Sequence, residues 1–421
     1  MIRRFSWFPV LVSALASATP TPAEAQELTL DRALAVMRRE HPLLRAAEAE
    51  LDAADADAVD AGLWTNPVLD ASYNPGVVQS SYDPAGYFAW GITQFFEVAD
   101  TPGARARVAR LREDATRSDR DALARELEIE VEAGFVRACD AEARRALWQM
   151  RLEQLRTVDS IVEARVDAGA APRYDLERFS IVLRSAEAAL ARADAELAAV
   201  RGELRATIGP GARTLAGPPV CDGLDAPPLP TREALEGALV ERPDLVAARA
   251  RAAAADAETF VASRSVMPGF ALRLGANFGA APGQVDLYAG VALPLPLLDH
   301  GQGAIRAAEG RAASAHGQLE AREIAAAERL AALHAAAMIA RESEERASAS
   351  LASSASMLDE ARAGYQSGQF SVLELADAFD AWGEIHVVAL ETRRTARDAE
   401  LAVARELGRS LRETPAPAGA R

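Results

Sequence analysis

Apolar residues recur at alternating steps of three and four along the segment that ends at Ile208. The positions are Leu176, Phe179, Leu183, Ala186, Leu190, Ala193, Leu197, Val200 and Leu204. A sustained seam of this kind is typical of helices that pack as in a coiled coil. The segment before it has no proline between Pro102 and Pro172. We therefore predict a helix from Thr101 to Asp167, about 100 Å long, followed by a short turn and a return helix that ends at Ile208.

Two shorter segments upstream of this hairpin alternate between apolar and polar or small residues with a period of two. Leu69, Ala71 and Tyr73 share one side of the first segment, and Phe88, Trp90 and Ile92 share one side of the second. We predict strands from Val68 to Tyr73 and from Tyr87 to Phe96, each with one apolar face. Two helices are predicted before them, from Leu28 to Glu40 and from Pro42 to Trp64.

The same order of elements restarts after residues 210–230, a linker rich in proline and glycine, at an offset of about 200 residues. A helix that opens at Pro243 ends near Met267, and strands are predicted from Phe270 to Phe278 and from Leu287 to Leu293. A second long helix, from Gly301 to Gln366, turns at Ser367-Gly368 and returns to Leu407. We predict an internal two-fold repeat of residues 26–209 and 231–410, followed by a disordered tail at residues 411–421.

Four predicted strands raise the main question about the fold, because four strands cannot close into a barrel. Open sheet edges do not occur in the hydrocarbon region of a membrane, and known spanning barrels have about eight strands or more. We therefore predict a mainly α-helical fold with a small membrane β part, in which long helices form an α-barrel and several copies share one β-barrel. The alternative is a soluble periplasmic coiled-coil scaffold with two small hairpins and no transport role.

The first 25 residues have the pattern of a signal peptide. Arg3 and Arg4 precede an apolar run, and Ala23-Glu24-Ala25 fits a cleavage site before Gln26. We expect the chain to leave the cytoplasm of a Gram-negative bacterium for the outer membrane, with its helices in the periplasm. The formal net charge of -16 argues against nucleic acid as a partner.

Catalytic and metal-binding patterns are missing from the sequence. The five histidines are scattered, and none has a histidine or cysteine partner at ligand spacing. We therefore expect neither an enzyme nor a cofactor. Cys139 and Cys221 form no metal motif. A disulfide between them is compatible with an oxidising compartment, but two unpaired thiols are the favoured prediction.

The residues around the fourth strand carry a resemblance to a known family. The segment from Gly290 to Glu309 resembles the heavy-metal (CzcC-like) branch of the TolC family of outer-membrane efflux proteins. In the first half, Gln94, Glu97 and Arg105 are similar to that branch's Gln-x-x-Glu…Arg pattern, although residues 98–102 replace its usual Gly-Gly-Lys type turn. The similarity extends over essentially the whole chain after the signal peptide.

This resemblance implies an assembly and a function. It implies a homotrimer with a twelve-stranded β-barrel in outer-membrane lipid and a helical tunnel in the periplasm. Such a channel is the passive exit duct of a tripartite system, docked to a periplasmic adaptor (membrane fusion) protein and an inner-membrane RND pump. The metal branch favours divalent heavy-metal cations as cargo. The alternative is the same duct serving multidrug efflux or type I secretion.

Each predicted helix–turn–helix tip carries a glycine, an acidic residue six positions later and then an aliphatic residue. Gly169 is followed by Asp175-Leu176, and Gly368 by Glu374-Leu375. The resemblance implies that the tips form the periplasmic mouth, with Gly169, Leu176, Gly368 and Leu375 as adaptor-docking residues.

The acids of these tips are the candidate aperture residues. Positions that match the family imply that Glu374 and Asp377 line the periplasmic aperture, whereas a solvated helix start is the alternative role for these acids. Asp175 and Tyr365 occupy the positions at which the family ties its closed mouth together, but Phe370 stands here in place of the family's arginine.

Two further patterns concern surfaces. The aromatic residues Trp64, Tyr87, Trp90, Phe95 and Phe96 fit a girdle at the membrane boundary. Gly303, Gly310 and Gly317 are spaced by seven residues, so they mark one helix face on which another backbone could come close.

Overall fold

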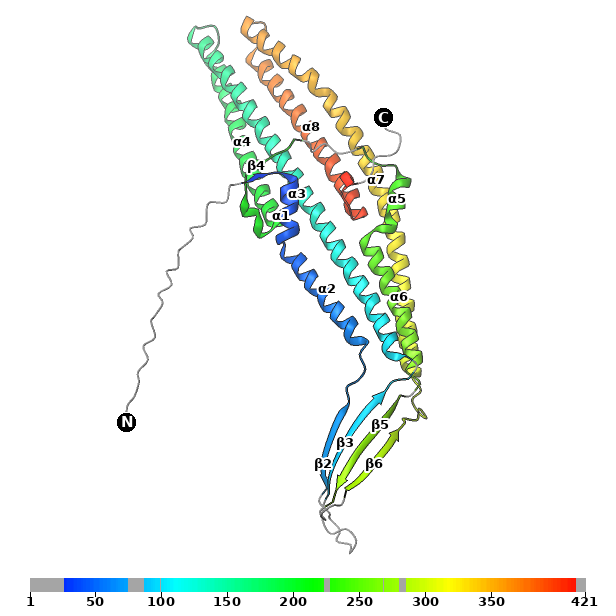
Figure 1. Ribbon diagram of the computed structural model, residues 1–421. Coiled ribbons are helices and arrows are strands. Elements are labelled where there is room, and N and C mark those ends of the chain that lie inside the picture. The colour runs from blue at the N-terminus through cyan, green and yellow to red at the C-terminus, as the bar shows by residue number, and fades with distance from the viewer. Residues whose placement is uncertain are drawn as a thin grey trace, which may run out of the picture.

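The computed structural model describes residues 26–74, 87–98, 100–222, 228–267, 269–279 and 285–413. The predicted signal peptide at residues 1–25 lies outside the described residues, as do residues 75–86 between the first two predicted strands and the tail beyond residue 413. The described chain is a long rod of helices with a small sheet at one end (Figure 1).

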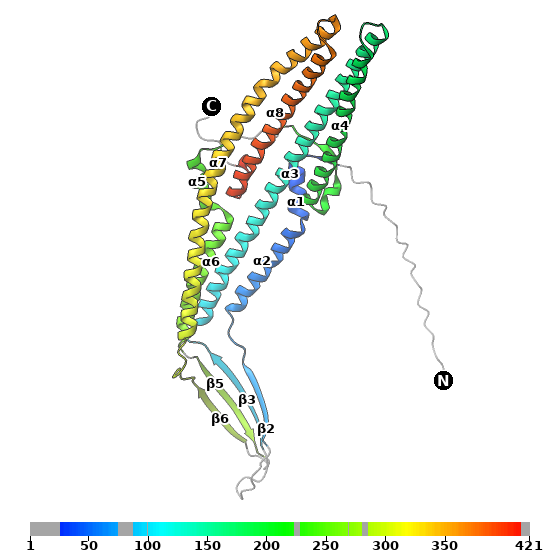
Figure 2. The same ribbon diagram turned by 180° about the vertical axis from the view of Figure 1, so that it is seen from behind.

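The two long hairpins form where the hydrophobic pattern predicts them. α3 spans Thr101–Asp167 and α4 Arg173–Ile208, while α7 spans Gln302–Ser367 and α8 Val372–Leu407. A Cβ on Gly134 of α3 would stand 3.2 Å from Leu204 Cδ1, so this glycine lets α4 come close. The tips of both hairpins lie at the end of the rod opposite the sheet, as Figure 2 also shows from behind.

The shorter helices lie beside the long ones. α1 spans Leu30–Glu40, α2 Pro42–Ala61, α5 Arg232–Ala238 and α6 Pro243–Arg264. α2 and α4 both pack against α3, and α6 and α8 both pack against α7. The predicted ends at Trp64 and Met267 extend too far, since α2 ends at Ala61 and α6 at Arg264.

The sheet is antiparallel, with the strand order β2-β3-β5-β6. β2 spans Val68–Asn74, β3 Tyr87–Phe96, β5 Phe270–Phe278 and β6 Val285–Ala292. The register places apolar residues of neighbouring strands opposite one another, and Leu69 pairs with Ile92, Ile92 with Leu274, and Leu274 with Ala289. This apolar face is open, because Leu69 is 68% and Leu287 84% exposed.

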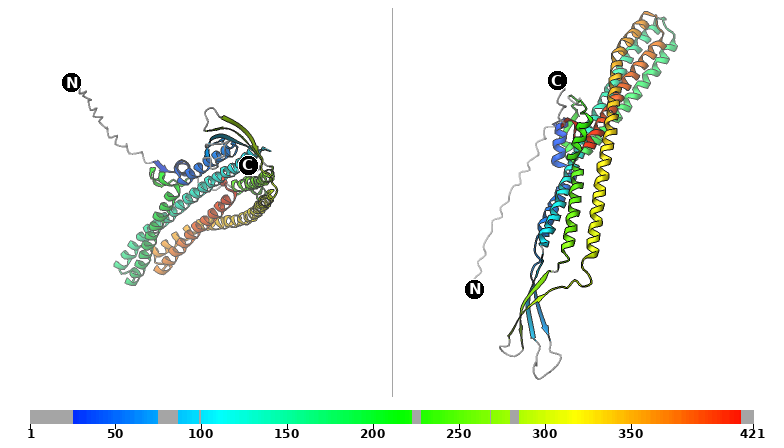
Figure 3. Two further views of the ribbon diagram at one scale, coloured as in Figure 1. Left: turned by 90° about the horizontal axis from the view of Figure 1, so that it is seen from below. Right: turned by 90° about the vertical axis from the view of Figure 1, so that its right-hand side faces the viewer.

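Each of these four strands directly precedes or follows one helix in the chain. The order of the strands in the sheet is therefore repeated by the order of these helices. α2 leads into β2, β3 into α3, α6 into β5, and β6 into α7. The adjoining helices accordingly pack in the order α2-α3-α6-α7. β2 and α2 form one edge of this layer, and β6 and α7 form the other. Seen from below, the sheet follows a curve (Figure 3, left).

The Gln-x-x-Glu…Arg residues hold the junction between sheet and helices. Arg105 of α3 binds both carboxylate oxygens of Glu97, with N–O distances of 2.6 and 3.0 Å. Gln94 donates from Nε2 to the carbonyl oxygen of Thr65 at 2.9 Å. The first contact ties the start of α3 to the end of β3, and the second ties β3 to the segment between α2 and β2. The motif therefore has a structural role.

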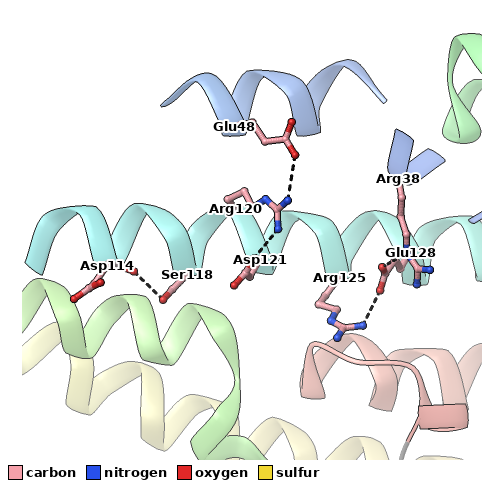
Figure 4. Close-up of polar contacts among 8 residues, drawn as sticks. All are labelled: Arg38, Glu48, Asp114, Ser118, Arg120, Asp121, Arg125 and Glu128. Atoms are coloured by element: carbon pink, nitrogen blue, oxygen red, sulfur yellow. Dashed lines mark hydrogen bonds and ion pairs between the residues drawn. The ribbon is translucent and has the colours of Figure 1, made fainter. Parts of the chain in front are cut away.

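Ion pairs link α3 to the first two helices along its middle (Figure 4). Arg38 of α1 binds Glu128 at 2.6 Å, and Arg120 binds Glu48 of α2 at 3.1 Å. Arg125 adds a second contact to Glu128 at 2.9 Å. Because most of these side chains are partly exposed, each pair contributes at most about 1 kcal/mol, and the buried apolar residues carry the packing.

Two apolar clusters both include residues from the middle of α3. One joins Met37, Val131, Phe135 and Ile208, and the other joins Ile129, Leu235, Leu330 and Leu407. α3 therefore contributes residues to both clusters, which place the short helices of the two halves around it. The second cluster also contains Leu411, which begins the 3-10 helix Leu411–Glu413. The disordered tail predicted from residue 411 is thus corrected for residues 411–413, because burial of Leu411 orders them.

The prediction of unpaired thiols is wrong, because Cys139 and Cys221 form a disulfide with a Cα–Cα distance of 5.7 Å. The linker predicted at residues 210–230 is also more ordered than expected at its start. It contains the 3-10 helix Pro210–Thr214 and the strand β4, Leu215–Pro219, which pairs in parallel with β1, Gln26–Leu28. The chain after α4 thus folds back to the middle of α3, which carries Cys139.

Candidate functional site

Both hairpin tips turn at a glycine in the left-handed region. Gly169 has φ +70° and Gly368 has φ +79°, values that strain any residue with a Cβ. Ala170 N–H donates to the carbonyl oxygen of Arg165 at 2.8 Å, and Gln369 N–H donates to that of Gly364 at 2.9 Å. These bonds close the last turns of α3 and α7. The positive φ at each turn explains why glycine occupies these two positions.

Glu374 is part of a capping box at the start of α8. Its Oε2 accepts from Ser371 N–H at 2.6 Å and from Ser371 Oγ at 2.8 Å, while Ser371 Oγ accepts from Glu374 N–H at 3.3 Å. The Ser371 N–H and hydroxyl lower the pKa of the Glu374 carboxyl from its usual value. The carboxylate is therefore charged at neutral pH and has a local function in starting the helix.

Asp377 and Asp380 follow Glu374 at steps of three, and all three side chains are exposed on α8. Asp380 binds Arg151 of α3, whose side chain is largely buried. The Arg151 guanidinium lies 5.2 Å from the Trp148 ring centre and fills the space that a side chain at Gly383 would need. Sequence reasoning missed Asp380, although the spacing of three from Asp377 was a signal for it.

Tyr365 joins the two hairpins below their tips. Its side chain is 2% exposed, and the Arg165 guanidinium lies 4.6 Å from its ring centre while donating to its carbonyl oxygen. Burial raises the pKa of the Tyr365 hydroxyl, with Arg165 opposing the shift and Asp175 adding to it. The structure thus brings Asp175 and Tyr365 into one electrostatic environment. Arg165 is a third member of this group, and the sequence did not predict its contact with Tyr365.

The apolar residues of the tips are mostly internal. Leu375 is 1% exposed and belongs to a cluster with Leu155, Phe179 and Phe379, drawn from α3, α4 and α8. Leu176 is half-buried against the same cluster. Leu375 therefore holds the hairpins together and presents no surface to a docked partner, contrary to the expectation for it.

A cavity of about 260 Å³ adjoins this cluster, with polar and apolar residues of α3 and α7 and Leu375 of α8 in its lining. Three buried atoms facing this region have no hydrogen-bond partner in the described structure: Gln154 Oε1, Arg362 Nε and Tyr365 Oη. The space is large enough for several water molecules, and these atoms supply the polar partners that such waters need. The contact between the hairpins thus combines an apolar cluster with a cavity that has polar groups in its wall.

The predicted aromatic girdle divides between two faces and two ends of the sheet. Trp90 and Phe96 share a face of β3, while Tyr87 and Phe95 share the other. Phe96 stacks on Phe270 with ring centres 5.2 Å apart and meets Trp64 edge-on at 6.2 Å. Trp64, Phe96 and Phe270 therefore form one cluster at the helical end of the sheet.

Metal-ligating side chains do not gather anywhere in the described ranges, where no group of three or more His, Cys, Asp or Glu could hold an ion. None of the helices within those ranges is long and apolar enough to cross a membrane.

Solved structures share the fold at low sequence identity. CusC has a TM-score of 0.75 at 20% identity, covering 90% of this chain and 92% of its own. VceC of Vibrio cholerae has a TM-score of 0.75 at 20% identity over 91% and 96% of the two chains. The open state of MtrE of Neisseria gonorrhoeae gives 0.73 at 18% identity over 99% and 100%.

Sequence comparisons point the same way. NccC, a nickel-cobalt-cadmium resistance protein of Alcaligenes xylosoxydans xylosoxydans, is 24% identical over 315 residues, which are 74% of this chain and 70% of that protein. The profile of the outer membrane efflux protein family matches residues 34–210 and residues 234–409. These ranges include both long hairpins and all four strands of the sheet. The chain therefore belongs to the outer membrane efflux protein family, whose TolC-like members are passive channels and not enzymes.

Proposed function

We propose that three copies of this chain form the exit duct of a tripartite RND-type efflux system in the outer membrane of a Gram-negative bacterium. The four strands of each copy contribute to one twelve-stranded barrel, and the helices continue it as a tunnel into the periplasm. The two halves of the chain act as a structural repeat. Residues 1–25 are removed as a signal peptide.

One observation carries this proposal: a sheet with free edges exposes a continuous apolar face. β2 and β6 each pair with one neighbour in the described structure, and Leu287, Leu69 and Val291 are more than two-thirds exposed. Water penalises such a face by roughly 25 cal/mol for every Å². Lipid removes that penalty, but only if the edge strands are paired. Further copies of the same sheet satisfy both requirements.

The hairpin tips form the periplasmic mouth and meet the adaptor protein. The exposed acids Glu374 and Asp377 line the aperture, and threefold symmetry repeats each of them in a ring. Rings of carboxylates favour cations by Coulomb attraction. Asp175 and Tyr365 set how far the two hairpins of one copy separate, since Arg165 holds Tyr365 against α3. Gly169, Gly368 and Leu176 shape the tip surface.

Divalent heavy-metal cations are the proposed cargo. The name of NccC, a nickel-cobalt-cadmium resistance protein, supports this choice, as does the acidic face of α8. The ions pass hydrated, and an inner-membrane pump supplies selection and energy. Organic toxicants or a secreted protein remain the alternative cargo of the same duct, and a soluble periplasmic scaffold is the alternative from another class.

A deletion strain tests the cargo directly. We expect hypersensitivity to cobalt, zinc, cadmium or copper that the wild-type chain complements, while sensitivity confined to dyes would refute the metal assignment. Extraction only with detergent, together with the outer membrane, separates a duct from a soluble scaffold.

The aperture acids are tested in planar bilayers. The double variant Glu374→Gln, Asp377→Asn removes both charges but keeps a side chain able to cap α8, and we expect a lower cation preference of single channels. Asp52→Asn with Asp55→Asn, both exposed on α2, is the matched control with the same change of charge. Equal selectivity of both variants and the wild type would exclude Glu374 and Asp377 from the aperture.

A further inference from the structure

The helix α7 exposes a stripe of small residues on the side turned away from α6. Gly303, Gly310 and Gly317 recur every seven residues, and a Cβ at any of them would meet nothing within 4 Å. Ala307, Ser314 and Ala321 are exposed on the same side. Glycine inside an exposed helix weakens the helix. Three glycines on one face therefore need a compensating interaction, and the described part of one copy places nothing against them.

The helix α2 carries a corresponding stripe at the opposite edge of the layer. Ala46, Ala49, Ala53 and Ala56 are exposed, whereas the buried residues Leu44 and Ala58 lie on the side that packs against α3. Both edges next to the sheet therefore present residues with minimal side chains.

The two stripes are compatible in direction and spacing. α2 runs toward the sheet, because it leads into β2, and α7 runs away from it, because it follows β6. Antiparallel helices with heptad spacing can match Ala53 with Gly310 and Ala46 with Gly317 at successive turns. In this pairing the end of α2 lies opposite the start of α7, and both of these helix ends adjoin the sheet.

Charges at the sheet end of the two stripes are complementary. Asp57 and Asp60 are exposed near the end of α2, and Arg306 is exposed near the start of α7. None of these three has an ion pair among residues 26–413 as far as the structure describes them. In the antiparallel match Arg306 lies level with the two aspartates.

We infer that α2 of one copy packs on the glycine stripe of α7 of the next copy, as a close antiparallel helix seam with Ala53 opposite Gly310. The inference rests on the proposed trimer and adds which surfaces meet and by which residues. A second copy is the occupant because the same two edges continue into β2 and β6, whose free edges need a strand of another copy. Such head-to-tail contacts close a ring, and the small residues let the backbones approach closely.

Disulfide cross-linking in the full chain tests the seam. The double variant Ala53→Cys, Gly310→Cys should give covalent dimers and trimers on denaturing gels after oxidation in the outer membrane. The native cysteines do not interfere, because they are bonded to each other. The control Glu50→Cys, Glu309→Cys places both thiols on the same helices but off the stripes, and should give at most a tenth of the product.

The outcomes separate the seam from the trimer. Two results would overturn the seam and leave the proposed duct intact. In the first, the protein forms heat-sensitive trimers but Ala53→Cys, Gly310→Cys gives no cross-links. In the second, the trimers form and the control pair gives the stronger cross-links. Absence of any trimer would overturn both.

A second variant tests the close approach. Gly310→Leu should strengthen an isolated exposed helix, yet we expect it to lower the temperature at which the trimer dissociates by at least 5 °C. Glu309→Leu, one residue away and off the stripe, should leave that temperature within about 1 °C. An unchanged or raised temperature for Gly310→Leu would show that no backbone lies against this face.

Discussion

Removing the Cys139–Cys221 disulfide should destabilise the chain by an amount that follows from the length of the loop it closes. The two cysteines are 82 residues apart. In the chain-entropy account, a cross-link over that distance removes about 4.5 kcal/mol of unfolded-state entropy at 25 °C. The expected shift is large because the closed loop contains the end of α3, all of α4 and the segment that returns to α3.

This free energy converts into a measurable shift of the thermal midpoint. Unfolding entropy is about 2.1 cal/mol/K per residue, which gives about 0.8 kcal/mol/K for a cooperative unit of the 421 − 25 = 396 residues that remain after the signal peptide is removed. We therefore expect the double variant Cys139→Ser, Cys221→Ser to unfold about 5 °C below the wild type. The measurement is the loss of helical circular dichroism on heating in detergent.

The controls distinguish the cross-link from packing. A reducing agent should lower the wild-type midpoint by the same amount and leave that of the double variant unchanged. Two free thiols in the untreated protein would refute the disulfide itself. A bonded protein whose midpoint moves by less than about 1 °C would refute the entropic reasoning, because β4 would then be held as tightly without the bond.

Two further predictions concern titratable groups near the middle of the rod. His41 caps α2 by accepting from Leu43 N–H at 3.3 Å, and burial lowers the pKa of its imidazole. The unfolded chain therefore binds the proton first, so stability is complete above the ordinary pKa of about 6.5 and falls as the pH drops below it. His41→Asn keeps a cap worth about 1 kcal/mol and should flatten the change in thermal midpoint between pH 7.5 and 5.5. An equal pH dependence in both proteins would contradict this reasoning. Burial also raises the pKa of the Asp140 carboxyl, against the attraction of Arg393 and Arg394. The charged form is then a net cost at neutral pH, so Asp140→Asn should raise the midpoint at pH 7.5 and have no such effect near pH 4. A loss of midpoint at pH 7.5 would mean that the arginines outweigh desolvation.

The long elements could be predicted from the sequence because local periodicity decides them. Steps of three and four located α4, which ends at Ile208 as predicted, and the stretch without proline located α3 at Thr101–Asp167. Alternation with a period of two located β3 at Tyr87–Phe96. These patterns report which side of a short segment is apolar, and a neighbouring element of any kind can cover that side. For these long elements the errors lay at the ends, such as the end of α2 at Ala61.

Most contacts between segments far apart in the chain could not be predicted from the sequence. Arg165 and Tyr365 are 200 residues apart, and no spacing rule links a basic residue at the end of one helix to a tyrosine at the end of another. The disulfide was missed for the same reason, since Cys221 lies in a segment rich in proline that predicted a free linker. Only the fold-back through β4 brings that segment to Cys139.

Glu374 shows why the role of a site residue is harder to predict than its position. An acidic residue at this place starts α8 through Ser371, and the same side chain stands exposed at the tip of the hairpin. Helix capping and a charged aperture require the same residue type at the same spacing, so the sequence pattern fits both. The two roles differ only in the effect of removing the charge of Glu374. Glu374→Gln preserves the cap and removes the charge, so stability reports the first role and ion selectivity reports the second. A variant that keeps its thermal midpoint but loses cation preference would assign the charge to the aperture and the geometry to the cap.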